Sequence, residues 1–317
     1  MPQRGKLNEI WYRFIESSGG IDKMDIQSDE FKKMVRKGIG SNYRTPVWIK
    51  ITSLDRYMEK RSGMYEKLKL MHESIPSQTK RIIDCDIIRT WPKHPGFTSE
   101  QLKNVLYSFH VAHPEIGYTQ GLNFFAAIFV LYLGEESGFW MLCNLIENYF
   151  PHDYFCNQLK DFQIDLRMIE IIIKERIPDV AKHAEELHHE WMLPASGWLL
   201  TLFTNSFPMA TVMRIWDCFL LEGSKVIYRV CIAFIRLHHD ILLEQQDKIA
   251  FTRMVYMLQS EMIDDEKLID LAFKLKAFSK NHIIELREMA RNSIGNDTNF
   301  KTTASAVTQK LFGLLNM

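Results

Sequence analysis

The 317-residue sequence lacks the features that would place it in several large protein classes. Its 39 lysines and arginines are balanced by 39 aspartates and glutamates, so there is no net charge to attract nucleic acid or an anionic membrane. The five cysteines are odd in number and widely spaced in mostly apolar sequence, which argues against a disulfide framework and suits a reducing compartment. Nucleic acid is therefore not an expected partner, and any recognition of an anion must be local.

Long hydrophobic runs are missing as well. The longest apolar run, at residues 124–133, is about half the length that a membrane-spanning helix needs, so it predicts a buried helix instead. The first residues, MPQRGK, show neither the apolar stretch nor the cleavage site of a secretion signal. We expect a cytoplasmic protein whose association with endomembranes, where it occurs, is peripheral and depends on a partner.

Motifs of nucleotide, hydrolase and metal chemistry are also absent. The sequence has no Gly-rich phosphate loop of the NTPase or dinucleotide type, and no G-x-S-x-G elbow of a serine hydrolase. Two His-rich stretches, at 183–190 and 238–240, lack the H-E-x-x-H spacing and the cysteine pairs of zinc sites. We expect no cofactor and no metal of the protein's own.

What the sequence has in abundance is helical periodicity. One amphipathic helix shows the spacing i, i+3, i+4, i+7 in its apolar residues, Leu102, Val105, Leu106 and Phe109. Thr98 and Gln101 form a capping box in front of it. The same spacing recurs around Trp216, with Pro208 suited to the first turn and Gly223 after the end. A further helix is predicted over residues 224–240.

The connections between these helices are short, and none is a Gly/Ser-rich or Pro-rich linker. No repeat of fixed period is present, which argues against a solenoid. The sequence therefore predicts one closed, all-α domain over residues 31–292. Residues 1–30 and 293–317 differ in composition and are predicted to be terminal extensions.

The first segment with a chemical signature is IDCDIIRTWP, residues 83–92. It predicts a helix that ends near Arg89, because Pro92 disfavours the helical conformation at Trp91. Ser77 is a candidate cap at the other end. Asp86 precedes Arg89 by three residues, so the two side chains are neighbours on the helix surface. An ordinary exposed ion pair has the same spacing.

The second segment is GYTQGLN, residues 117–123, which leads from a loop into the apolar run. Gln120 precedes Gly121, and a glycine there permits a positive φ or a close approach of the backbone. Asn123 is a candidate helix cap, and Tyr118 offers a ring to pack and a hydroxyl to bond. Taken alone, this pattern is an ordinary junction between a loop and a helix.

Together the two long side chains suit chemistry on a phosphate. Arginine presents a fixed fork of donors to phosphate oxygens, and glutamine can accept from a water while donating elsewhere. Transfer of a phosphoryl group to water needs both services, because the charge on the transferring group must be stabilised and the attacking water must be oriented.

The order of these segments resembles the TBC domain of GTPase-activating proteins for Rab-type small GTPases. That family has two signatures, I-x-x-D-x-x-R and Y-x-Q, and both are intact here. Upstream, KGIGSNYRTPVW at residues 37–48 is similar to the family's opening segment. Downstream landmarks extend the resemblance over residues 38–239. They are Trp198, Phe203, Phe207-Pro208, Arg214-Ile215-Trp216-Asp217 and Gly223.

The resemblance implies roles for individual residues. Arg89 would be an arginine finger and Gln120 a glutamine finger, with Asp86 and Tyr118 in support and Arg44 at the edge of the site. Gly121 and Asn123 would support the loop that carries Gln120.

The resemblance also implies a partner, a GTP-bound Rab protein, and with it a place in vesicle trafficking. The Mg²⁺ and the GTP would belong to that partner, so this protein would be an activator and not itself an enzyme. Two positions depart from the family pattern: Gly40 replaces a usual proline, and His113 stands where asparagine is common. A non-catalytic helical adaptor with the same fold remains the alternative.

Overall fold

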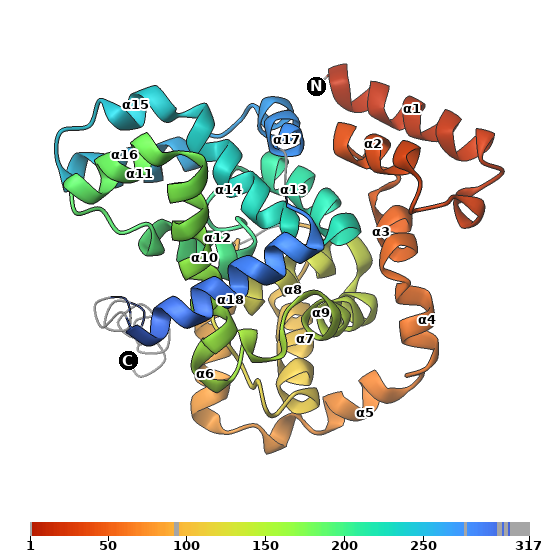
Figure 1. Ribbon diagram of the computed structural model, residues 1–317. Coiled ribbons are helices and arrows are strands. Elements are labelled where there is room, and N and C mark those ends of the chain that lie inside the picture. The colour runs from red at the N-terminus through yellow and green to blue at the C-terminus, as the bar shows by residue number, and fades with distance from the viewer. Residues whose placement is uncertain (1, 92–94, 276–277, 297–299, 301–303, 305–317) are drawn as a thin grey trace. The chain divides into compact units, whose positions relative to one another are not determined.

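The structure, a computed structural model, describes residues 2–91, 95–275, 278–296, 300 and 304 (Figure 1). In this part of the chain the regular structure consists of eighteen α-helices and four short 3₁₀ helices, without a strand. The predicted all-α fold is confirmed. Contacts between helices divide the chain into two compact units, Met1–Gln158 and a second that begins at Leu159. Both motifs belong to the first unit.

The first unit is built around α8, which is apolar on nearly every side and therefore buried. It packs against α7, α9, α3 and α6. The helices of this unit are α1 (Pro2–Ser17), α2 (Asp29–Lys37), α3 (Arg44–Thr52), α4 (Leu54–Glu59), α5 (Met64–Leu70), α6 (Ser77–Arg89), α7 (Ser99–Ala112), α8 (Leu122–Leu133) and α9 (Glu135–Tyr149).

Helix starts in this unit show which capping predictions hold. At α7 the capping box is confirmed: Thr98 Oγ1 accepts from the Gln101 amide at 3.1 Å, and Gln101 Oε1 accepts from the Thr98 amide at 2.9 Å. The predicted cap at Ser77 is wrong, because α6 already includes Ser77 and extended Pro76 takes the cap position without a side-chain bond.

The N-terminal helix α1 packs beside α2 in the first unit (Figure 1). Trp11 is fully buried, and its Nε1 donates to the Gly38 carbonyl at 2.7 Å. Gly40 makes the close approach of α1 possible, because a Cβ there would lie only 2.9 Å from Cα of Asn8. Position 40, where the resemblance leads us to expect a proline, is thus the place where α1 packs most closely.

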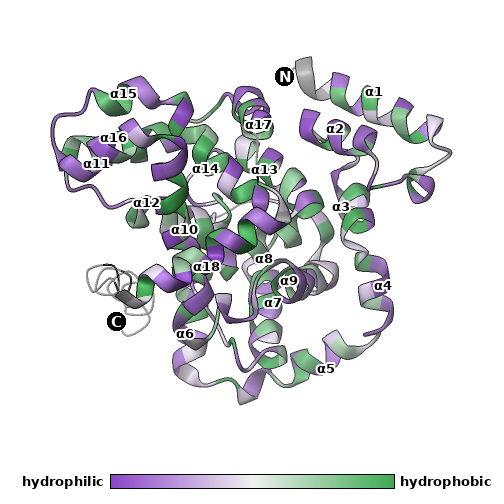
Figure 2. Cartoon of the chain, in the orientation of Figure 1, coloured by the Kyte–Doolittle hydropathy of each residue, from purple (hydrophilic) through white to green (hydrophobic). Residues whose placement is uncertain are grey.

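In the second unit, α10 packs against α11, α12, α14 and α18, and α14 packs against α13 and α17. Its helices are α10 (Lys160–Arg176), α11 (Pro178–Glu186), α12 (Met192–Thr201), α13 (Met209–Glu222), α14 (Lys225–Leu237), α15 (His239–Leu243), α16 (Lys248–Ser260), α17 (Asp265–Lys274) and α18 (Lys280–Asn296). Figure 2 shows hydrophobic and hydrophilic residues alternating along these helices, as expected when one face is buried.

Two predictions in this unit need adjustment. Trp216 is fully buried on α13, as expected, but Pro208 is the N-cap of that helix and does not lie in its first turn. The single helix predicted over residues 224–240 is two helices, because His238 leaves the helical conformation between α14 and α15. Most of the predicted extension at 293–317 lies outside the described residues.

None of the helices in the described part of the chain combines the length and the apolar character needed to cross a membrane.

Candidate functional site

Arg89 is the last residue of α6. Ile83 and Ile87 hold one face of this helix in the core, whereas the side chain of Arg89 is 45% exposed. Thr90 then turns the chain into an extended conformation, and Trp91 follows with a φ of 42°. The helix thus ends at Arg89 as predicted, although Pro92, the residue expected to end it, lies outside the described residues.

Asp86 connects the two motifs through its two carboxylate oxygens. Oδ1 lies 2.5 Å from Nη2 of Arg89, and Oδ2 accepts a 2.6 Å hydrogen bond from the Tyr118 hydroxyl. The carboxylate is buried, at 4% exposure. Asp86 therefore orients the guanidinium at the end of α6 and ties the Gln120 loop to the same helix.

The electrostatics of this trio follow from burial. Burial raises the pKa of Asp86 above its ordinary value, while the Tyr118 hydrogen bond and the Arg89 charge pull it down. Burial, together with the charge on Asp86, raises the pKa of Tyr118 well above its ordinary range. Tyr118 therefore stays protonated and acts as a donor.

Gln120 lies in the loop between α7 and α8, half-buried and one residue before Gly121. The loop is fixed at both ends of its irregular part. Near its start, the Gly117 amide donates to the His113 carbonyl at 2.8 Å, and near its end Thr119 Oγ1 donates to the Phe155 carbonyl at 3.0 Å. Gly121 adopts a φ of 108°, which L side chains rarely reach, so the predicted need for glycine is confirmed.

Asn123 makes a second link between the two motifs. Its Oδ1 accepts from the Gly121 amide at 3.1 Å, and its Nδ2 donates to Thr90 Oγ1 at 2.8 Å. Thr90 in turn donates to the Asp86 carbonyl at 2.6 Å. The prediction that Asn123 caps the helix is wrong, because Gly121 is the N-cap of α8 and Asn123 lies in the first turn. Its side chain instead joins the Gln120 loop to the residue after Arg89.

Arg44 has a different setting. It begins α3, and its guanidinium lies 3.4 Å from the Tyr132 hydroxyl and 3.3 Å from the Ile39 carbonyl. Tyr132 is near the far end of α8, about 15 Å along the helix from Leu122 at a rise of 1.5 Å per residue. The contacts described for Arg44 thus hold it at the end of α8 that is remote from Gln120.

Thr90 and Thr119 were not among the predicted site residues, although each adjoins one of them. Both are buried hydroxyl residues, with 2% exposure, and both make hydrogen bonds that fix the motifs. A signal was available in the sequence, since Thr90 directly follows the first signature, Thr119 lies inside the second, and buried hydroxyl groups are usually hydrogen-bonded.

The structure also places the histidines that were weighed as metal ligands. His183 and His189 bond the Gln245 carbonyl and Thr252 Oγ1, at 2.9 and 3.0 Å. Among the described residues, potential metal-donor atoms converge instead at His152, Asp153 and Cys156, within 4.8 Å of one another. No motif in the sequence marks these three residues. Hydrogen bonds already connect them, with 2.8 Å between His152 Nδ1 and Asp153 Oδ1.

Comparison with known proteins gives a consistent result. The family model for the Rab-GTPase-TBC domain matches residues 41–243. TBC1 domain family member 2A of Homo sapiens is 30% identical over 277 residues, which cover 85% of this chain and 30% of that protein. Growth hormone-regulated TBC protein 1 of Xenopus laevis, which residues 222–230 resemble, is 29% identical over 245 residues, covering 75% of this chain and 70% of that protein.

Solved structures share the fold. The TBC domain of the Chlamydomonas flagellar RabGAP superposes with a TM-score of 0.73 at 25% identity, covering 85% of this chain and 90% of that one. The Ypt/Rab-GAP domain of Gyp1p has a TM-score of 0.64 at 24% identity, covering 79% and 92%. The chain spans about 30% of the length of the TBC1 domain family member 2A that it matches. Because the family model matches more than half of the 317 residues, the chain belongs to the Rab-GTPase-TBC domain family.

Proposed function

We propose that this protein accelerates GTP hydrolysis by a Rab-family small GTPase in its GTP-bound state, with Arg89 and Gln120 supplied in trans. The observation that carries the proposal is the buried carboxylate of Asp86, which contacts Arg89 with one oxygen and Tyr118 with the other. It joins the arginine motif to the glutamine loop in a member of the Rab-GTPase-TBC domain family.

Arg89 would enter the nucleotide site of the partner. Its guanidinium would neutralise the charge that spreads over the γ-phosphate and the leaving oxygen in the transition state. Such a finger accelerates hydrolysis by about 10³ to 10⁵, or roughly 4 to 7 kcal/mol of barrier. An exposed surface ion pair contributes under about 1 kcal/mol. The size of this contribution therefore distinguishes a catalytic arginine finger at Arg89 from an ordinary surface ion pair.

Gln120 would orient the attacking water in place of a glutamine carried by the GTPase. A carboxamide suits this task, since it accepts from the water with its oxygen and donates with its nitrogen. Its loop is braced at Tyr118 and, through Gly121, at Asn123, so little ordering remains to be done when the complex forms. GTP and Mg²⁺ would come with the partner, and membrane association would arise through the Rab, at endomembranes.

A non-catalytic adaptor that binds a GTPase through the same fold is the rival. The adaptor hypothesis predicts that the protein binds a GTPase without stimulating GTP hydrolysis, and it assigns no catalytic role to Arg89 or Gln120. The buried Asp86 favours catalysis, because a surface used only for docking has no need of a desolvated carboxylate that orients a single guanidinium.

The test is phosphate release from a panel of purified, GTP-loaded Rab proteins with this protein added. We expect at least one Rab to respond, and we expect Arg89→Ala to remove the stimulation while leaving binding. Arg81→Ala is the matched control, since Arg81 is an exposed arginine on the same helix. Binding of a Rab by the wild-type protein with no stimulation across the panel would favour the adaptor.

A further inference from the structure

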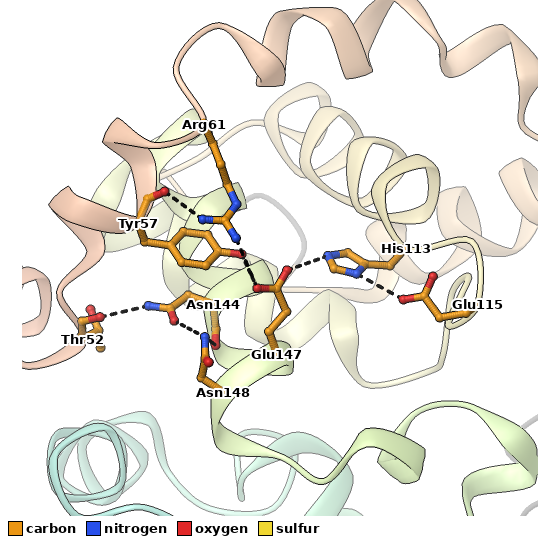
Figure 3. Close-up of polar contacts among 8 residues, drawn as sticks. All are labelled: Thr52, Tyr57, Arg61, His113, Glu115, Asn144, Glu147 and Asn148. Carbon is orange, nitrogen blue, oxygen red and sulfur yellow. Dashed lines mark hydrogen bonds and ion pairs between the residues drawn. The ribbon is translucent and has the colours of Figure 1, made fainter.

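A polar network lies beside the Gln120 loop, centred on Glu147 of α9 (Figure 3). Glu147 Oε2 accepts a 2.7 Å hydrogen bond from the Tyr57 hydroxyl and lies 3.6 Å from Nη2 of Arg61. The Arg61 guanidinium in turn covers the Tyr57 ring at 3.6 Å from its centroid. One carboxylate oxygen of Glu147 is thus held by α4 and the turn that follows it.

The other oxygen of Glu147 faces His113, the first residue after α7. Oε1 lies 3.7 Å from Nε2 of His113, and the other ring nitrogen, Nδ1, lies 3.4 Å from Oε1 of Glu115. The side chain of His113 is only 12% exposed, and its ring packs on Phe109 with centroids 4.7 Å apart. Each ring nitrogen of His113 thus faces a glutamate carboxylate, Nε2 that of Glu147 and Nδ1 that of Glu115.

His113 also organises the start of the Gln120 loop. Its carbonyl accepts from the Gly117 amide at 2.8 Å and from the Ile116 amide at 3.1 Å. The turn that leads to Tyr118 therefore depends on the position of His113. A displacement of His113 would shift this turn as a unit.

A cavity of about 220 Å³, partly open to solvent, adjoins this turn. The loop lines it with His113, Glu115 and Ile116, and the facing wall includes Glu147, Phe150 and Phe155. Where a cavity takes the place of packed side chains, the side chains that line it make fewer van der Waals contacts across it. The polar contact from His113 to Glu147 joins two residues that line it.

We propose that His113 and Glu147 are positioning residues for Gln120, holding its loop to α9 across this cavity. The inference rests on the proposed function for Gln120, but it also makes a structural claim that can be tested without a GTPase.

The structural test is amide hydrogen exchange in Glu147→Ala and His113→Ala. We expect the amides of Ile116 and Gly117 to exchange at least about fivefold faster in both variants, because the start of the loop is released. Helices α6 and α8 should be unchanged, because the contacts described for the two side chains do not involve them. Glu136→Ala is the matched control, an exposed glutamate on the same helix. Unchanged exchange at Ile116 and Gly117 in folded Glu147→Ala would overturn the proposal.

The kinetic test uses single-turnover hydrolysis with a responsive Rab. Glu147→Ala should lower the maximal rate by about tenfold and change the half-saturating concentration by less than about twofold, because the loop is misplaced but the docking surface is intact. In a Gln120→Ala background the same substitution should have no further effect on the rate. A comparable loss in both backgrounds would show that Glu147 does not act through Gln120.

The two tests separate the inference from the proposed function. If no Rab responds to the wild-type protein, the proposed function fails. Hydrogen exchange still decides whether the contact between His113 and Glu147 holds the loop. If a Rab responds and Gln120→Ala abolishes the response, but Glu147→Ala keeps the full rate, the positioning role alone is wrong.

Discussion

The hydroxyl of Tyr118 donates a 2.6 Å hydrogen bond to Oδ2 of Asp86, 32 residues earlier in the chain. Through this single bond, the residue that precedes Gln120 by two positions is tied to the residue that orients Arg89. Neither motif can therefore be regarded as an independent surface feature, and the dependence can be measured.

Tyr118→Phe should destabilise the protein by roughly 1 to 3 kcal/mol, because it removes the donor and leaves a buried carboxylate oxygen without it. Asp86→Asn should destabilise as well, and the double variant should lose less than the sum, with a coupling of about 0.5 to 3 kcal/mol. Urea unfolding of the four proteins measures this cycle. Simple additivity would mean that the hydrogen bond contributes no stability.

Arg89→Lys should lower the maximal rate of Rab-stimulated hydrolysis by at least about 10², as should Arg89→Ala, with little change in the melting temperature. Lysine keeps the charge but loses the planar fork that contacts several oxygens at once. Single-turnover rates decide the point. Activity near wild type in Arg89→Lys would rule out a finger whose geometry matters.

Gln120→Ala should abolish most of the stimulation, whereas replacing the Rab's own switch glutamine should leave much of it, if Gln120 orients the water. Gln120→Asn should fail too, because one methylene fewer withdraws the amide by about 1 Å from a site that does not tolerate such shifts. The four combinations of wild-type and mutant glutamine on the two partners supply the measurement. Full dependence on the Rab glutamine, with Gln120→Ala active, would leave Arg89 as the only finger.

Trp216→Ala should destabilise the protein by roughly 3 to 5 kcal/mol, since Trp216 is fully buried and its Nε1 donates to the Leu202 carbonyl at 3.1 Å. Gln120→Ala, a half-buried loop residue, is the control and should leave the melting temperature nearly unchanged. Thermal melts of both variants compare a core side chain with a candidate catalytic one. A wild-type melt for Trp216→Ala would mean that its side chain does not support the core.

His189 should make stability depend on pH. Burial, with a smaller effect of the Lys248 charge, lowers the pKa of His189 from 6.5 to about 4. The unfolded chain takes up a proton on His189 near pH 6.5, whereas the folded protein does so only near pH 4. The contribution of His189 to the free energy of unfolding is therefore fully present above pH 6.5, and it falls by roughly 3 kcal/mol as the pH is lowered to 4. Denaturant unfolding of the wild type and His189→Asn at several pH values checks this: the difference between them should shrink as the pH falls.

Much of the fold was predictable because amphipathic helices show a periodic spacing of apolar residues in the sequence. The capping box at Thr98, the buried run that became α8 and the buried face around Trp216 all follow from local spacing. The errors are local too. Ser77 and Asn123 are good capping types, but the neighbouring Pro76 and Gly121 adopt the non-helical conformation that the cap position requires.

The site was predictable only in part. The identities of Arg89 and Gln120 came from their signatures, and their roles stay predictions. The contacts that connect the signatures did not follow from the sequence, because a hydrogen bond such as Asn123 to Thr90 joins residues 33 apart and has no period. The contact between His113 and Glu147 could not be predicted for the same reason, because neither residue stands out in the sequence from other polar side chains.

The close packing of α1 against Gly40 affects how this protein should be produced for such experiments. A shortened protein that begins at residue 31, where the composition first suggests a domain boundary, would lose Trp11 and uncover Phe31, the ring against which Trp11 packs. Exposed aromatic surface of this kind promotes aggregation. Recombinant versions should therefore keep the first helix, and an affinity tag is better placed where it does not push Asn8 away from Gly40.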